Sequence, residues 1–308
     1  ESRLSREPVQ QLPRFTPVDV VPEHEAPEID RTPKLYIGGK QQRPDGGYCN
    51  AAYDAGGKII AEIPAGNRKD IRNAVEAARS AEAWSSATAY NRAQVIYYIS
   101  ENLSARSEEF TARIARLSGK ETFQARAELD LCIRRIYHYA AMSDKNDGRV
   151  HSTPFRNVTL SMKEPLGVIG IVAPEEAGLL GFISTLMPAI AMGNRVVIVP
   201  SQHYALLASD FYQVLDTSDL PGGVINIVTG DQEVLAEVLA RHYDIEGVWY
   251  WGSREGSRMV ETQAAATMKR TWVNYGLYHD WEDDEQGQGA SFLRHATEIK
   301  NIWIPYGE

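Results

Sequence analysis

The sequence has few of the features that mark a secreted, membrane-bound or nucleic-acid-binding protein. It contains only two cysteines, Cys49 and Cys132, which suits a reducing setting better than a disulfide-linked secreted domain. Its formal net charge of −9 disfavours nucleic acid and anionic lipid as partners, since both require basic surface. No apolar run reaches the ~18 residues that a membrane-spanning helix needs. We therefore expect a cytoplasmic protein that binds neither nucleic acid nor membrane.

The dinucleotide-binding fingerprint G-x-G-x-x-G is also absent. The nearest substitute is Trp251–Ser257, where Gly252 follows a predicted strand and a predicted helix begins at Arg254. Backbone N–H groups at such a helix start can hold a phosphate. A tight turn in which Ser253 caps the helix explains the same residues, and we favour this interpretation. His138 has no second His or carboxylate at metal-ligand spacing, and we expect no metal site.

The amino-terminal region is rich in proline and has no sustained hydrophobic periodicity. Residues 1–33 therefore predict a linker, or an arm lying on another domain, rather than a folded unit. Because the sequence starts at Glu1 without a leader-like segment, we expect it to be a piece of a longer chain. A short predicted strand, Lys34–Gly39, follows and ends at a Gly-Gly turn.

Helical spacing of apolar residues then predicts a group of helices. One begins after Asn67 as its N-cap, a second covers about 90–104 with a continuation to Leu117, and a third covers Thr122–Met142. Cys132 falls on the apolar face of the third helix. We therefore expect it to be a core residue.

From Val158 onward, the pattern changes to short β-branched runs that alternate with helical patterns. The predicted strands are Val168–Ala173, Arg195–Val199, Val224–Val228, Val248–Trp251 and Thr271–Tyr275. This alternation favours an α/β fold with a doubly wound, Rossmann-type parallel sheet covered by helices on both faces. A last strand, Ala296–Pro305, is expected to pair with the hairpin-like stretch 150–163 or with another subunit.

Several motifs stand in a distinctive order and spacing: Gly57–Glu62, Glu164–Val168, Pro188–Asn194, Leu220–Val228, Gly252-Ser253 and Ala296–Ile302. In this order they resemble the aldehyde dehydrogenase family. The similarity covers about residues 34–276 and 289–305 and implies a nucleotide-fold domain, with 150–163 and 290–308 as oligomerisation strands.

The sequence departs from the family pattern where the resemblance places its chemistry. Glu176 stands at the position of the oxyanion-hole Asn, and Asn274 stands at that of the general-base Glu. A carboxylate cannot donate to an oxyanion unless it is protonated, and an amide has no useful basicity. Neither Cys49 nor Cys132 lies in the region that matches the nucleophilic Cys. The resemblance therefore implies a pseudo-enzyme without catalytic residues.

The cofactor contacts implied by the resemblance are altered as well. Val199 replaces the Lys that holds the adenosine ribose, and Ser257 replaces a pyrophosphate-binding Gly. Negative charge at Glu175 and Glu176 would also oppose an anionic cofactor. We expect no bound NAD, and keep only a vestigial set of candidate positions: Pro174, Val199, Gln202, Gly252, Ser253 and Ser257.

We expect the acidic stretch 277–289 to be a solvated loop that takes the place of the family's catalytic domain, which would then be missing. A truncated, degenerate unit after a linker resembles the carboxy-terminal module of the two-module family-sixteen aldehyde dehydrogenases. The resemblance implies a scaffold, 34–276, that packs on an upstream aldehyde dehydrogenase module of the same polypeptide. We further expect a homodimer formed through edge strands near Val158–Ser161 and Lys300–Ile304.

Two alternatives stay open. The first is a vestigial NAD(P)-binding regulatory module that uses Gly252, Ser253 and the helix start at Arg254. The second is a contribution in trans to an NAD-dependent aldehyde oxidoreductase whose chemistry lies in the upstream module.

Overall fold

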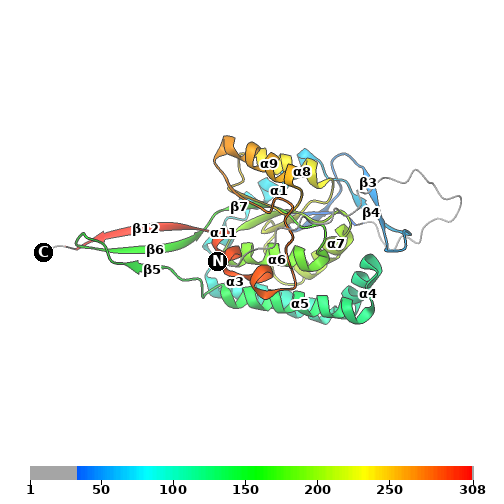
Figure 1. The fold of residues 1–308 in the computed structure, drawn as a ribbon, viewed down its shortest axis with the longest axis horizontal. Coiled ribbons are helices and arrows are strands. Elements are labelled where there is room, and N and C mark those ends of the chain that lie inside the picture. Colours follow the sequence, from blue (N-terminus) through cyan, green and yellow to red (C-terminus); the bar gives the residue numbers. More distant parts are fainter. Residues whose placement is uncertain (1–32, 307–308) are drawn as a thin grey trace.

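The chain is built around a mixed seven-stranded sheet, and a computed structural model describes its residues 33–306 (Figure 1). The strands follow the order β11-β10-β7-β8-β9-β1-β2, in which β7 to β11 are parallel and the β1–β2 hairpin adds antiparallel strands at one edge. Their bounds are β1 Leu35–Ile37, β2 Lys40–Gln42, β7 Val168–Val172, β8 Arg195–Val199, β9 Ile225–Ile227, β10 Gly247–Tyr250 and β11 Arg270–Val273. The predicted doubly wound α/β sheet is confirmed.

Helices cover both faces of the sheet, as Figure 1 shows. On one face lie α1 (Arg68–Ser80), α8 (Gln232–Arg241) and α9 (Arg254–Ala264). The other face is covered by α6 (Gly178–Ala191) and α7 (Ala205–Asp216). Outside these two helices lie α3 Ala89–Ala105, α4 Ser107–Ser118 and α5 Thr122–Met142, with the short α2 Ala83–Ser86 before them. A separate hairpin, β3 Cys49–Tyr53 with β4 Ile59–Pro64, precedes α1.

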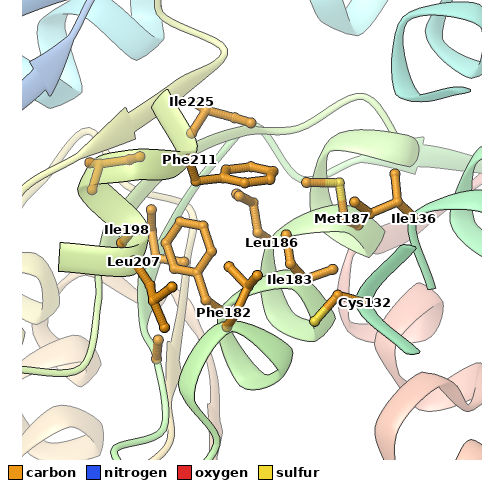
Figure 2. Close-up of a cluster of buried hydrophobic side chains, with 14 of the residues drawn as sticks. Cys132, Ile136, Phe182, Ile183, Leu186, Met187, Ile198, Leu207, Phe211 and Ile225 are labelled. Atoms are coloured by element: carbon orange, nitrogen blue, oxygen red, sulfur yellow. The ribbon is translucent and has the colours of Figure 1, made fainter. Parts of the chain in front are cut away.

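Helix α6 is the centre of the core, and every one of its residues is buried. A helix that is apolar all round cannot face water, so it needs partners on each side. Figure 2 shows Phe182, Ile183, Leu186 and Met187 of α6 between the side chains of α5 and those of α7 and the sheet. Cys132 of α5 belongs to this cluster, which confirms it as a core residue.

Local signals placed several helices correctly. Asn67 caps α1 by accepting from the backbone N–H groups of Lys69 and Asp70, and the Asp70 side chain returns the bond in a capping box. Helix α5 has the predicted bounds, Thr122–Met142. No helix within residues 33–306 is long and apolar enough to cross a membrane.

A three-stranded sheet projects from the body (Figure 1), and we call it the extension. It consists of β5 (Arg149–His151), β6 (Asn157–Pro165) and β12 (Thr297–Pro305), in the order β12-β6-β5. Strand β12 pairs with β6 over its whole length, which confirms the first of the two expected pairings. The prediction of a free edge at Val158–Ser161 is wrong, because β6 is the middle strand and β5 covers Thr159–Ser161.

Two further sequence predictions need correction at the carboxy-terminal end. Residues 277–289, which we call the strap, were expected to form a solvated loop, but they include a short helix, α10 (Asp284–Gln288), and bury Trp281. The predicted strand region 290–308 begins with another helix, α11 (Ala290–His295), because Phe292 and Leu293 are drawn into the core. The linker or arm was predicted for residues 1–33. Residues 1–32 lie outside the described residues, and Pro33 is buried.

Candidate functional site

The carboxyl edge of the sheet is the place where doubly wound folds bind their ligands. The structure brings the candidate segments together there, each directly after a strand. Pro174 to Glu176 follow β7, Val199 to Gln202 end β8, Gly252 to Ser257 follow β10, and Asn274 follows β11. Because the strands are parallel, residues that are far apart in the sequence lie together at the carboxyl edge of the sheet.

The end of β8 is closed by a carboxylate of this chain. Glu175 accepts a hydrogen bond from Ser201 Oγ at 2.7 Å and from the backbone N–H of Gln202 at 2.8 Å. The side-chain amide of Gln202 donates to Gly230 O at 3.2 Å. Val199 is fully buried. The hydroxyl of Ser201 and the backbone N–H and side-chain amide of Gln202 are therefore already bonded within the chain.

The turn after β10 is a helix cap, as the favoured interpretation expected. Ser253 Oγ accepts from Gly256 N at 2.9 Å, and Ser257 Oγ donates to Ser253 O at 2.9 Å. Ser257 Oγ also accepts from Tyr275 N at 3.1 Å. These bonds use the hydroxyls of both serines to tie the start of α9 to its own turn and to β11.

Tyr250, which the sequence analysis did not single out, fills the space in front of this turn. A Cβ atom added to Gly256 would lie 1.9 Å from Tyr250 Oη, and one added to Gly252 would lie 2.6 Å from it. The phenol is buried, which raises its pKa above the ordinary value. Both glycines are therefore explained by close approach of this ring. A strand-terminal Tyr followed by Gly at two and six residues is the signal that could have revealed it.

Asn274, which the sequence analysis matched with the family's general base, forms three hydrogen bonds in the turn after β11. Its Oδ1 accepts from Gly252 N at 3.1 Å and from Gly276 N at 3.3 Å. Its Nδ2 donates to Leu277 O at 3.3 Å. An ionised carboxylate could accept the first two bonds but could not donate the third. The amide therefore fits the turn that leads from β11 into the strap.

Glu176, which the sequence analysis matched with the family's oxyanion-hole Asn, contacts the strap. Trp281 Nε1 donates to Glu176 Oε1 at 3.4 Å. Burial raises the pKa of Glu176, because desolvation penalises its charged form. Trp281 itself is 4% exposed and packs its ring 4.9 Å from Trp251 and 4.4 Å from His279. The strap thus covers the sheet edge with an aromatic cluster that also includes Trp249, Trp272, Phe292 and His295.

Arg135 of α5, also missed from the sequence, holds the other end of the strap. Its guanidinium is fully buried and donates to Ser184 Oγ at 2.5 Å and to Asp283 O at 3.4 Å. A Cβ at Gly287 would fall 2.3 Å from Arg135 Nη2, so the strap passes directly against this side chain. The strap is therefore packed structure and not an open tether.

Neither cysteine is placed at this edge. Cys49 is exposed on the β3–β4 hairpin, and Cys132 is buried in α5, where desolvation raises its pKa well above the ordinary value. A raised pKa leaves a thiol protonated and a poor nucleophile. Across residues 33–306, no group of His, Cys, Asp and Glu could hold a metal ion.

The fold is that of the doubly wound, Rossmann-type α/β class. The aldehyde dehydrogenase family matches residues 44–277, and the chain belongs to this family. An aldehyde dehydrogenase from Agaricus bisporus is 31% identical over 227 residues, which are 72% of this chain and 45% of that protein. The NADP/NAD-dependent aldehyde dehydrogenase PuuC of Escherichia coli (strain K12) is 30% identical over 75% of this chain and 49% of its own length.

A solved structure gives the same picture. The NAD-dependent aldehyde dehydrogenase from Sinorhizobium meliloti superposes with a TM-score of 0.76 at 25% identity, covering 80% of this chain and 50% of that one. The chain thus spans about half the length of the relatives it matches.

Proposed function

We propose that the chain is a non-catalytic, aldehyde-dehydrogenase-like scaffold module that forms a homodimer and packs against an upstream aldehyde dehydrogenase module of the same polypeptide. In this respect it would correspond to the truncated carboxy-terminal module of the family-sixteen enzymes. One observation carries the proposal: the carboxyl edge is filled by the chain's own residues, with Glu175 at β8, Tyr250 at β10 and Trp281 across the edge.

The residues at this edge do not fit NAD. Tyr250 occupies the space before α9, and the N–H groups of Gly252 and Gly256 are bonded to Asn274 and Ser253. The carboxyl group of Glu175 would meet an anionic ligand at β8.

The same edge offers no set of groups for aldehyde oxidation. Thiohemiacetal chemistry needs a thiolate, a donor for the oxyanion and a base for the water. Within residues 33–306 the corresponding positions hold Glu176 and Asn274, and the two thiols lie elsewhere. Loss of a donor or of a base costs ~10²–10⁴ in rate each.

The catalytic part of the proposal is tested on residues 1–308. We expect no NAD(P)-dependent aldehyde oxidation and no heat on titration with NAD(H) or NADP(H). Measurable turnover would falsify the scaffold assignment. Heat without turnover would instead support the vestigial regulatory module, and turnover gained only on mixing with the upstream module would support a contribution in trans.

Support for the dimer comes from one face of the extension, which we call the apolar extension face. Cross-strand pairing puts Leu160 opposite both Val150 and Ile302, and Val158 opposite Ile304, so these side chains share one face. Much of it is open to solvent: Val150 is 73% exposed and Ile304 47%. The full set is Val150, Val158, Leu160, Met162, Ile302 and Ile304. Exposed apolar faces of this kind mark protein contacts, and a second copy with the same face gives a closed pair.

A matched pair of substitutions in β12 tests this interface. Ile304→Glu puts a charge on the apolar extension face, whereas Ile299→Glu puts the same charge on the opposite face, where Ile299 is 64% exposed. We expect sedimentation to show a dimer for the native chain and for Ile299→Glu, and a monomer for Ile304→Glu. Dimerisation through this face would be contradicted if the native chain stayed monomeric at high concentration. It would also be contradicted if both variants lost the dimer to the same extent.

A further inference from the structure

A groove of about 640 Å³ lies between α1 and α8, outside the site described above. Its walls carry four cationic side chains, Arg68, Lys69 and Arg72 from α1 and Arg241 from α8, against a single carboxylate, that of Glu237. Such a concentration of positive charge is unusual on a chain whose formal net charge is −9. The groove therefore favours an anionic occupant.

The cationic side chains of the groove can exchange their present carboxylate partners for those of a ligand. Lys69 pairs with Asp45, Arg72 with Glu76, and Arg241 with Glu237. The three cationic side chains are more than half exposed, and exposed pairs of this kind contribute little to stability. Arg68 forms no ion pair with any residue in the range 33–306. An incoming carboxylate can therefore bind without breaking a strong contact.

The groove also has an apolar part. Val234 is exposed at its surface, and Val238 lines it beside the cationic groups. An occupant that matches both features carries several carboxylates interspersed with small apolar side chains. A free phosphate or pyrophosphate would satisfy the charges but would leave the valines uncovered.

The chain itself contains such a stretch, Asp19–Asp30, with the sequence DVVPEHEAPEID. It has five carboxylates, no Lys or Arg, and the apolar residues Val20, Val21 and Ile29. The stretch is tethered close to the groove, because Leu35 Cδ2 lies 3.8 Å from the Cβ position of Gly66, and Gly66 adjoins the groove residue Asn67. A chain advances up to about 3.5 Å per residue, so residues before Pro33 can reach and follow the groove.

We propose that the acidic stretch 19–30 docks intramolecularly in the basic groove between α1 and α8. A short tether gives the stretch a high effective concentration at the groove, so several weak ion pairs suffice to hold it. The docked stretch would cover part of the surface of α1 and α8 and would fix where the preceding polypeptide leaves the module. This inference does not depend on the absence of catalysis or on the dimer.

Cleavage by a glutamyl endopeptidase tests the proposal on the full 308-residue chain, with Glu23, Glu25 and Glu28 as the sites followed by mass spectrometry. We expect the double variant Arg68→Glu, Arg241→Glu to be cut about tenfold faster than the native chain at low salt, as the loss of a tethered set of exposed ion pairs implies. High salt should remove the difference. Arg126→Glu is the matched control, because Arg126 also forms an exposed i,i+4 pair, with Asp130, but lies on α5.

Equal cleavage rates in the native chain and the groove variant would overturn the proposal. Protection that rises with protein concentration would overturn the intramolecular placement, because the stretch would then belong to a second copy. If Arg126→Glu removed the protection as fully as the groove variant does, the effect would be due to net charge. That result would also overturn the proposal. Amide hydrogen exchange over 19–30 gives an independent reading that does not require a protease.

Discussion

The carboxyl edge of the large sheet and the extension differ in how far their side chains are covered by the rest of the chain. At the edge, Glu175, Glu176 and Asn274 accept hydrogen bonds from within the chain, and Trp281 closes the surface. On the extension, the apolar extension face remains open although it belongs to a well-paired sheet. A site whose groups are already satisfied has little left for a ligand, whereas an uncovered apolar face gains free energy only by finding a partner. The difference supports a module kept for assembly.

The largest expected effect comes from removing the tryptophan that closes the edge. Trp281→Ala should lower the free energy of unfolding by about 3–5 kcal/mol, because it leaves a cavity among Trp251 and His279. Trp303→Ala on the extension should change it by no more than about 0.5 kcal/mol in the monomer, since Trp303 is 59% exposed. Chemical denaturation of both variants measures the contrast. Similar losses would mean that the strap is not part of the core.

The joint between the extension and the body of the protein should give the next largest effect. Asn194 is fully buried, and its Nδ2 donates to Ala189 O at 2.9 Å and to Ala296 O at 2.8 Å. Its Oδ1 accepts from Gly167 N at 3.0 Å. The side chain thus ties α6 to the residues that lead out of β6 and into β12.

Asn194→Ala leaves several buried backbone groups unpaired, and we expect a loss of about 1–3 kcal/mol in the free energy of unfolding. Hydrogen exchange should rise most in β12 near Thr297, next to the lost bond. The exposed Asn301→Ala, on the same strand, is the control and should behave as the native chain does. An evenly distributed increase in exchange would contradict a role for Asn194 at the joint.

A smaller effect is expected at the position of the general base. Asn274→Asp keeps the two accepted bonds but loses the donated bond to Leu277 O. We expect a loss of about 0.5–1.5 kcal/mol in the free energy of unfolding, and no aldehyde oxidation. Asn274→Glu tests the chemistry directly, because it restores the residue type of the base. Activity gained by this change alone would show that the edge still binds substrate and cofactor.

The parts of this comparison that rest on local patterns could be predicted from the sequence. The bounds of α5 follow from its periodicity, and the cap at Asn67 follows from the residues beside it. The parallel strands β7 and β8 are continuous apolar runs, and their alternation with helices fixes the sheet.

The parts that depend on distant contacts could not be predicted. Strand β5 is three exposed residues without an alternating pattern, so nothing showed that it would cover β6 and remove that edge. The burial of Trp281 depends on Trp251 and Glu176, which lie far away in the sequence. Tyr250 was missed for another reason: the sequence carries its signal, a strand-terminal Tyr with Gly two and six residues later, but the close approach of its side chain to both glycines is seen only in the structure.

The smallest expected effect is a pH dependence of the closed edge. Burial lowers the pKa of His279 below the ordinary value of 6.5, because desolvation by the aromatic cluster penalises the imidazolium. In the unfolded chain His279 takes up a proton near pH 6.5, whereas in the folded chain it stays neutral to a lower pH. The unfolded state therefore binds more protons in this window, and stability should be full above about pH 7 and decrease as the pH falls through 6.5.

His279→Gln should reduce this decrease, since Gln does not titrate but can still donate to Gln286 O, which lies 2.9 Å from His279 Nε2. Denaturant titrations of both chains between about pH 5 and pH 8 measure it. The control is His151→Gln on the exposed strand β5, which should leave the pH profile unchanged. His138, His242 and His295 also have lowered pKa values from burial, so part of the decrease should persist in every single variant. A profile identical in the native chain and His279→Gln would mean that the strap opens to solvent before this histidine titrates, and the edge would then be far less closed than its packing indicates.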